Sequence, residues 1–293
     1  MTDQKKAKEL CAMVFNQPTR NIKVMKRLPQ GRSNALFVMK VNDKLVTARI
    51  PGKASERFID YRLEESALKQ AEASSLTPKT LYYDTLTGLK VSTYIPGETL
   101  NSSNIDSHIH KVADALHKLH HHTPKSTKSY DPFLYIKTLL MELKLSSETN
   151  TWVSEYMTKL KKAYTVPSKL TLIHGDLNPS NLLFDEHDKV WLLDFEYAKV
   201  YDPLYDMASF ASVSMASAKS LLHHYLDKEP STKEFAKLTY YRALQTFTWY
   251  VIARVKHDKN VGLNYTIDFK KIAEFFKDET MDLWQEYIKF IKG

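Results

Sequence analysis

The sequence predicts an α+β fold, with a five-stranded antiparallel sheet and one helix in the N-terminal third and a mostly helical remainder. Three observations support this prediction. Short segments rich in β-branched and aromatic residues alternate with turn residues as far as Ile95. Pro96-Gly97 then breaks the pattern, and from about Ile105 apolar residues recur at helical spacing. We therefore predict an N-terminal lobe, 1–95, and a C-terminal lobe, 96–293.

The N-terminal lobe divides into short elements at its turn residues. A turn at 29–33 separates the first two strands, and Asn42-Asp43 predicts a tight hairpin between the second and third. A strand, a loop with one glycine and a hairpin is the layout of a loop that covers a nucleotide, although any β-meander has it too. The predicted helices are 4–15 and 55–73, and the predicted strands are 21–28, 34–41, 44–50, 81–83 and 89–95.

The C-terminal lobe has helical periodicity on both sides of a stretch with a different pattern. In that stretch, the apolar run 170–173 enters a turn at His174-Gly175-Asp176. Two further apolar runs bracket the turn 185–188, which predicts a hairpin that brings Asp194 and Glu196 close to Asp176. The predicted helices are 105–121, 135–144, 152–164, 203–226, 231–256 and 267–291.

Composition limits the class of protein. The chain has 293 residues, of which 43% are hydrophobic and 26% charged, enough for a large core. The single cysteine, Cys11, excludes an internal disulfide and fits a reducing compartment. No apolar stretch follows the basic N-terminal residues, and no run approaches the ~18 apolar residues of a membrane span. We expect a soluble cytoplasmic protein without a membrane span.

The net charge of +8 is unevenly distributed. Residues 1–95 contain 17 lysines and arginines against 9 acidic residues, so the whole excess lies there. Such a lobe could attract nucleotide phosphates or nucleic acid. No motif of interleaved aromatic and basic residues accompanies the charge, so we expect no nucleic-acid partner and a mostly solvated basic face. The stretch 174–206 is acidic instead, with only Lys189 and Lys199 as basic residues.

Three polar residues in the central stretch form a candidate reaction site. Asn181 follows Asp176 at five residues, and Asp194 follows the predicted hairpin. Two carboxylates and one amide oxygen suit Mg²⁺, which completes its shell with substrate phosphates and water. Ordinary turn residues are the alternative, but the spacing, the apolar flanks and the second aspartate would then all have to coincide.

The motifs around these residues resemble a known superfamily. HGDLNPSN, LLDFEYA and YDPLYDMA are similar to the aminoglycoside phosphotransferases and choline kinases, most closely to the bacterial choline/ethanolamine kinases. The resemblance implies a protein-kinase-like two-lobe fold that uses ATP and Mg²⁺, with Asp176 as the catalytic base and Asn181 and Asp194 as metal ligands. Gly175 and Glu196 replace the Arg and Gly of protein kinases, which indicates a small-molecule kinase without phosphorylation switching.

The resemblance also assigns the nucleotide site. Val46–Ile50 occupies the place of V-A-I-K, with Arg49 instead of Lys, and we predict that Glu64 pairs with Arg49 and aims it at the ATP phosphates. An outward-facing strand arginine is the alternative. The remaining candidates are Ser33 and Asn34 on the loop, and Tyr94 and Ile95 as part of an adenine hinge that could equally be a plain edge strand.

The second substrate is predicted to be a small cationic alcohol, most simply choline. Glu196, Asp202 and Asp206 form a local acidic surplus, and Tyr197 and Trp249 could offer aromatic faces to a quaternary ammonium. We expect Asp206 to brace the catalytic loop rather than to contact this substrate.

Two departures from the choline kinase pattern leave other acceptors open. Ile252 stands where the family has a second Trp, and Val213 where it has a Glu. Ethanolamine, thiamine and an aminoglycoside are the competing acceptors. An inactive nucleotide-binding module is the alternative of a different class, and the intact Asp176, Asn181 and Asp194 favour the active enzyme.

A histidine cluster allows two interpretations. His117, His120, His121 and His122 have spacings that could converge on zinc. They also lie at a predicted helix C-terminus, where the helix dipole favours positive charge. We prefer the second interpretation, because no cysteine or carboxylate falls at ligand spacing.

Overall fold

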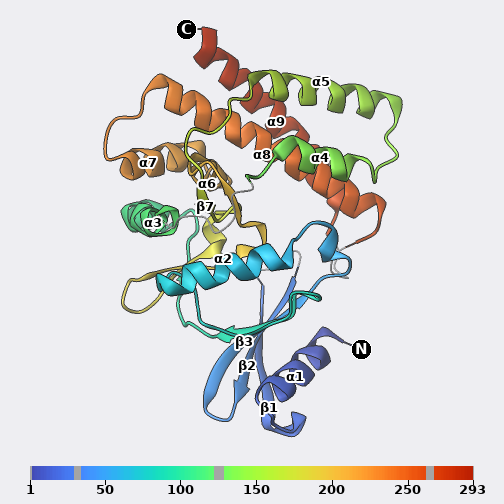
Figure 1. Cartoon of the computed structure of the whole chain (residues 1–293), viewed down its shortest axis with the longest axis vertical. Coiled ribbons are helices and arrows are strands. Elements are labelled where there is room, and N and C mark those ends of the chain that lie inside the picture. The colour runs from blue at the N-terminus through green and yellow to red at the C-terminus, as the bar shows by residue number, and fades with distance from the viewer. Residues whose placement is uncertain (1, 30–33, 122–128, 262–266, 293) are drawn as a thin grey trace. The chain divides into compact units, whose positions relative to one another are not determined.

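The computed structural model describes residues 2–29, 34–121, 129–261 and 267–292 (Figure 1). It confirms the predicted α+β class, with a five-stranded antiparallel sheet followed by a helical part. The chain forms two compact units. The first takes in the described residues of Met1–Asn101, Pro179–Ala198 and Val261–Tyr265, and the second those of Ser102–Asn178, Lys199–Asn260 and Thr266–Gly293. The division into lobes after Ile95 stays a prediction.

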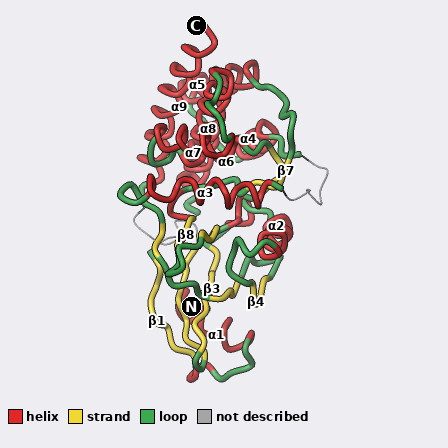
Figure 2. Tube along the Cα trace, turned by 90° about the vertical axis from the view of Figure 1, so that its left-hand side faces the viewer, coloured by secondary structure: helices red, strands yellow, loops and turns green. Residues whose placement is uncertain are grey.

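The sheet of the first unit has the order β1-β2-β3-β5-β4, and all its neighbouring strands are antiparallel. Figure 2 labels three of these strands, β1, β3 and β4. Helix α1 packs against this sheet through Ala7, Leu10 and Cys11, which join the buried strand residues in one core. The side chain of Thr2 accepts a hydrogen bond from Lys5 N and caps α1. These elements are α1 Asp3–Val14, β1 Ile22–Leu28, β2 Asn34–Val41, β3 Lys44–Pro51, β4 Thr80–Tyr83 and β5 Lys90–Thr93.

The helix predicted over 55–73 is shorter than expected. Ser55–Arg57 forms a separate 3-10 turn, η2, and helix α2 covers Tyr61–Ala73. The cause is Asp60, whose extended backbone and side chain, accepting from the amides of Arg62 and Leu63, start a new helix.

A second, three-stranded sheet of order β6-β8-β9 completes the first unit. It contains the predicted hairpin and a two-residue strand, β6, that was not predicted. Gly97 precedes β6, and a Cβ at this position would lie 2.2 Å from the carbonyl oxygen of Phe184, so the close approach of the two strands requires glycine. The elements are β6 Glu98–Thr99, β8 Leu182–Phe184 and β9 Val190–Leu192, with the 3-10 turns η3 Pro179–Asn181 and η4 Phe195–Tyr197.

The second unit is helical apart from one antiparallel pair, β7 with β10. Its longest helix, α8, begins with a capping box between Ser231 and Glu234. Helix α9 packs against α8, where the hydroxyls of Thr246 and Thr280 share a buried hydrogen bond. The elements are α3 Ile105–His120, α4 Pro132–Leu140, α5 Ser147–Ala163, β7 Thr171–Ile173, β10 Lys199–Tyr201, α6 Leu204–Phe210, α7 Met215–Leu226, α8 Thr232–Asp258 and α9 Phe269–Lys292.

Three predicted helices of this unit have different bounds, for one shared reason. Asp131 caps α4, Ser146 caps α5 and Ser214 caps α7, each with a side-chain oxygen that accepts from a backbone amide one turn on. Consequently α4 and α5 begin earlier than predicted, and the helix predicted over 203–226 is two helices, α6 and α7.

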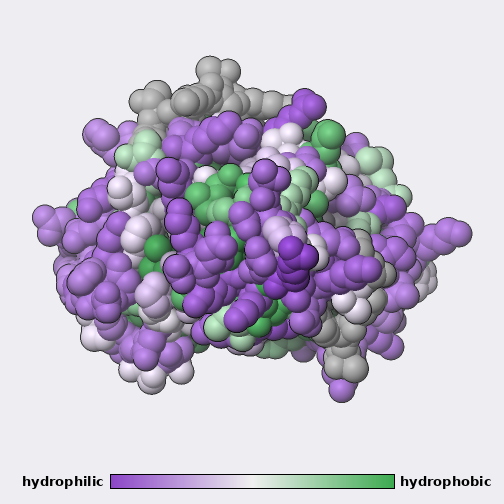
Figure 3. Space-filling view, turned by 90° about the horizontal axis from the view of Figure 1, so that it is seen from below, coloured by the Kyte–Doolittle hydropathy of each residue, from purple (hydrophilic) through white to green (hydrophobic). Residues whose placement is uncertain are grey.

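The face shown in Figure 3 is mainly hydrophilic, with a group of apolar side chains near its middle. Exposed apolar residues of the first unit include Met13, Met25 and Leu45, which come from three different elements. Among the described residues, no helix is both long and apolar enough to cross a membrane.

Candidate active site

The first unit contains a pocket of about 270 Å³. Apolar side chains line part of it, including Leu28 and Leu36 from the five-stranded sheet and Leu183 and Leu193 from the hairpin region. The pocket brings together five residues that were predicted from the sequence, namely Arg49, Tyr94, Ile95, Asn181 and Asp194. It also contains Lys90, which sequence reasoning missed.

The predicted ion pair between Arg49 and Glu64 is confirmed. Arg49 on β3 donates from Nη1 and Nη2 to the two carboxylate oxygens of Glu64 on α2, at 2.5 and 2.9 Å. Arg49 is only 2% exposed, so it is not an outward-facing strand residue. Burial alone would raise the pKa of the Glu64 carboxyl, but the charges of Arg49 and Lys90 outweigh burial and lower this pKa.

Gly88 fixes the other side of the Arg49 guanidinium. Its carbonyl oxygen accepts from Arg49 Nε at 3.2 Å and from Nη2 at 3.0 Å. Gly88 has a φ of +72°, and a Cβ there would lie 2.4 Å from the ring of Tyr61. Both the left-handed backbone and the close ring therefore require glycine at this turn.

Asp194 adopts a backbone conformation that is unusual for its residue type. Its φ is +63°, in the left-handed region, and its Oδ1 lies 3.6 Å from Arg49 Nη1. Non-glycine residues in this region carry a cost of about 1 kcal/mol or more and cluster at functional sites. Nearby, the carbonyl of Asn181 accepts from Leu193 N at 2.8 Å, which ties η3 to the strand end that leads to Asp194.

Asn181 and Asp194 together offer an amide oxygen and a carboxylate to the same pocket. This donor set fits Mg²⁺, which needs only one or two protein carboxylates when phosphates and water supply the other ligands. Within the described part of the chain, no group of three or more His, Cys, Asp or Glu residues is placed to hold a metal.

Glu196 is half-buried, two residues after Asp194, and pairs with the nucleotide-loop candidate Asn34. Asn34 Nδ2 donates to Glu196 Oε2 at 2.6 Å. Burial and the charge of Asp194 raise the pKa of Glu196 to about 8. Tyr197 follows in η4 and is half-buried. Ser33, the other loop candidate, lies outside the described residues.

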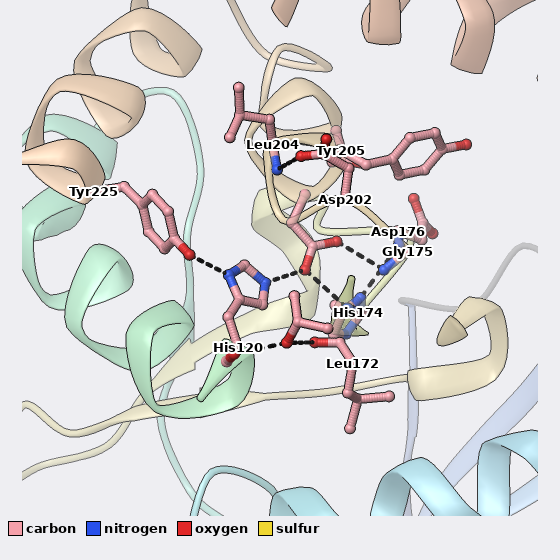
Figure 4. Close-up of polar contacts among 12 residues, drawn as sticks. His120, Leu172, His174, Gly175, Asp176, Asp202, Leu204, Tyr205 and Tyr225 are labelled. Atoms are coloured by element: carbon pink, nitrogen blue, oxygen red, sulfur yellow. Dashed lines mark hydrogen bonds and ion pairs between the residues drawn. The ribbon is translucent and has the colours of Figure 1, made fainter. Parts of the chain in front are cut away.

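The turn that carries Asp176 is held by a buried carboxylate in the second unit. Asp206, fully buried on α6, accepts from His174 N and Gly175 N, both at 2.8 Å. The predicted bracing role of Asp206 is thus confirmed. Gly175 has a φ of +81°, a conformation that the arginine of protein kinases would adopt only with strain. Figure 4 shows Asp176 directly beyond this turn.

A histidine completes the brace. His120 Nε2 lies 3.0 Å from Asp206 Oδ2, and His120 Nδ1 lies 2.9 Å from the hydroxyl of Tyr225 (Figure 4). Burial would raise the pKa of Asp206, but the interactions with His120 and His174 and the Gly175 amide outweigh it and lower this pKa. Both ring nitrogens of His120 are engaged and His117 stacks on Tyr225, which disfavours the zinc alternative.

Lys199 on β10 is a second cation that sequence reasoning missed. Its ammonium lies 4.1 Å from the ring centroid of Tyr130 and 4.9 Å from that of Tyr205. Burial lowers its pKa to about 8, although the charges of Asp206 and Asp176 act in the opposite direction. The only signal in the sequence was its position as one of two basic residues in an acidic stretch.

Two of the three carboxylates that favoured a cationic acceptor, those of Asp202 and Asp206, are bound by other groups of the protein. Asp202 is 2% exposed, accepts from Leu204 N and Tyr241 Oη, and pairs with Lys237. Asp206 is engaged as described above. Asp202 and Asp206 therefore give no support to a cationic acceptor, contrary to the expectation from the sequence. Trp249, half-buried on α8, stacks on Phe276 in the second unit. Because Glu196 and Tyr197 belong to the first unit, a joint acceptor pocket stays a prediction.

Comparisons with known proteins agree on the class. The chain superposes on a choline/ethanolamine kinase family protein from Mesorhizobium loti with a TM-score of 0.76 and 21% identity, covering 99% of this chain and 98% of that one. Choline kinase LicA from Streptococcus pneumoniae gives 0.76 and 20%, with coverages of 97% and 100%. A thermostable mutant of aminoglycoside phosphotransferase APH(4)-Ia, in complex with ADP and hygromycin B, gives 0.71 and 14%, with coverages of 96% and 98%.

These similarities define a kinase-like fold shared with enzymes that phosphorylate small molecules. Residues 24–237 match the Phosphotransferase enzyme family, and the chain belongs to that family. No curated protein matches its sequence.

Proposed function

We propose that this protein transfers the γ-phosphoryl group of ATP to the hydroxyl of a small amino alcohol. The observation that carries the proposal is the brace on the turn before Asp176, where a fully buried carboxylate holds two consecutive backbone amides at 2.8 Å. A buried charge fixed in this way has a high desolvation cost. We infer that this cost is retained because the buried carboxylate fixes the orientation of the Asp176 side chain, which the reaction requires.

The mechanism follows from the chemistry of the residues. Asp176 accepts the proton of the acceptor hydroxyl while the hydroxyl oxygen attacks the γ-phosphorus, and ADP leaves with the former bridging oxygen. The pocket of the first unit would take ATP, with Tyr94 and Ile95 at the adenine end. Asn181 and Asp194 would hold Mg²⁺, which, when bound, offsets the charge of the phosphates.

Choline is the acceptor that we propose to test first. Family membership and the named relatives support an alcohol acceptor, and Tyr197 and Trp249 remain aromatic candidates for a cationic head group. Ethanolamine, thiamine and an aminoglycoside are the competitors. Asp202 pairs with Lys237, and Asp206 accepts from the amides of the turn, so neither carboxylate supports the choice of a cationic acceptor.

The test measures ADP release by the full chain with Mg·ATP and each of choline, ethanolamine, thiamine and kanamycin, and identifies the product by mass spectrometry. We expect one acceptor to raise turnover clearly above the ATPase activity in water. Asp176→Asn should lower kcat by about two orders of magnitude or more while ATP affinity stays unchanged, because only the base is lost.

The matched control is Asp185→Asn in the turn between β8 and β9, where the carboxylate accepts from Trp191 Nε1 and from the amides of His187 and Lys189. This variant should retain turnover. Wild-type turnover in Asp176→Asn would remove Asp176 from the mechanism. ATP binding without phosphorylation of any alcohol would instead support an inactive nucleotide-binding module.

A further inference from the structure

We propose that Lys199 binds a second hydroxyl group of the acceptor, so that the protein acts on amino alcohols that carry at least two hydroxyls. The inference rests on the proposed function, because it refines the acceptor of the same reaction. It concerns a side chain of the second unit, close to Asp176, to which the motifs give no role.

The strand pairing places Lys199 next to the turn that carries Asp176. In the β7–β10 ladder Lys199 is the partner of Ile173, the last residue of β7 before that turn. Burial lowers the pKa of Lys199, while the charges of Asp206 and Asp176 raise it. Burial and nearby charges, among them that of Asp176, raise the pKa of the Tyr205 hydroxyl (Figure 4). Both effects require Asp176 to lie near this cluster of the second unit.

The Lys199 ammonium has hydrogen-bond donors without an acceptor. It carries three N–H groups, but among the described residues it makes neither a hydrogen bond nor an ion pair. Its contacts are the rings of Tyr130 and Tyr205, whose centroids lie 4.1 and 4.9 Å away. The carboxylate of Asp206 is already engaged with the turn amides and with His120. Because Lys199 is only 9% exposed, a ligand oxygen that accepts from it would remove the cost of buried, unsatisfied donors.

A second polar group of the same cluster lacks a partner. The hydroxyl of Tyr130, whose ring contacts the Lys199 ammonium, is buried and has no hydrogen-bond partner within the described ranges. Buried polar groups are normally paired, so an unpaired hydroxyl beside an unpaired ammonium points to a missing ligand group. A hydroxyl both accepts and donates, so one ligand hydroxyl is able to serve Lys199 and Tyr130 together.

The local charges favour a neutral oxygen at this position. A cationic group of the ligand would meet the positive charge of Lys199, and a carboxylate would meet the charges of Asp176 and Asp206. A hydroxyl supplies the missing acceptor without adding charge. In this arrangement the reacting hydroxyl lies at Asp176, the second hydroxyl lies at Lys199, and the amine points away from both cations and rings of the cluster.

The experiment compares serinol, an amino alcohol with two hydroxyls, with alaninol, the same molecule without one of them. With Mg·ATP at pH 7, we expect the wild-type kcat/KM to be about 10- to 100-fold higher for serinol, as expected for a hydrogen bond to a charged group. In Lys199→Met this ratio should fall to within about threefold, whereas Lys199→Arg, which keeps charged donors, should retain a preference for serinol. A general loss of activity cancels from the ratio, because both acceptors are measured on the same variant.

The matched control is Lys159→Met on α5 of the same unit. The Lys159 ammonium also lies over a tyrosine ring, 4.5 Å from the centroid of Tyr156, but it already pairs with Glu155. The ratio in this variant should equal that of wild type. Thermal melts establish that each variant is folded, and Lys199→Leu replaces Lys199→Met if the latter unfolds.

Equal kcat/KM values for serinol and alaninol in wild type would overturn the inference while leaving the proposed function intact. A preference for serinol that persists unchanged in the folded Lys199 variants without charge would overturn it too. The inference is also wrong if wild type phosphorylates choline better than serinol, or phosphorylates another alcohol but not serinol. A wild-type protein that phosphorylates no alcohol would remove the proposed function itself.

Discussion

Replacing Asp206 by alanine should cost both stability and turnover. The carboxylate accepts from the buried amides of His174 and Gly175, at 2.8 Å each, and faces His120 at 3.0 Å. A buried donor left without its partner costs about 1–3 kcal/mol. Two buried amides and one histidine ring nitrogen, His120 Nε2, would lose their partner, which predicts a loss of about 3–5 kcal/mol in the free energy of unfolding, less if water enters the space. Because the turn before Asp176 is then free to move, kcat should also fall by at least about tenfold.

Urea unfolding and steady-state kinetics with the preferred acceptor measure the two effects. Asp131→Ala is the matched control, since Asp131 also accepts from two backbone amides, those of Phe133 and Leu134, but at the exposed start of α4. Loss of such a cap costs about 1 kcal/mol and should leave kcat unchanged. If Asp206→Ala lost no more stability than Asp131→Ala and kept its kcat, the bracing argument would be refuted.

Two further substitutions test the buried networks. Gly88→Ala should lower the free energy of unfolding by more than about 1 kcal/mol, because the new methyl group meets the ring of Tyr61 at a residue with φ +72°; an unchanged urea midpoint would contradict this. Burial lowers the pKa of Lys199 from its ordinary 10.5 to about 8, so the unfolded chain binds the extra proton between these two pH values. The contribution of Lys199 to stability should therefore rise as the pH increases through this window and stay constant below it. The difference in unfolding free energy between wild type and Lys199→Met, measured from pH 7 to 10, should show this rise, and a pH-independent difference would count against it.

Much of the site could be predicted because its chemistry is local in sequence. The motif around Asp176 fixes residue types and spacing, and the hairpin that leads to Asp194 has its own turn signal. The sheet was predicted from its apolar runs and turns for the same reason. Even the pairing of Arg49 with Glu64 followed from a motif and the face of one helix, and it is present in the structure.

Helix bounds were less predictable, because capping depends on backbone conformation as well as on residue type. Asp60 and Ser214 both lie inside stretches with continuous apolar periodicity, so the periodic pattern passes over them. Each starts a helix because its backbone is extended and its side chain accepts from an amide two or three residues on. Neither feature can be read from periodicity alone.

The environments of Lys199, which is buried, and Lys90, which is half-buried, could not be predicted, because they are assembled from distant parts of the chain. Lys90 has its closest carboxylate on Glu64, from a helix that precedes it, and Lys199 has its aromatic contacts from Tyr130 and Tyr205. In the sequence both lysines resemble the solvated residues that most lysines are. Burial changes what they can do, because an ammonium without enough compensating charge favours a nearby anion. The motif identifies Arg49, but it does not record that in the folded chain the guanidinium donates to both Glu64 and Gly88.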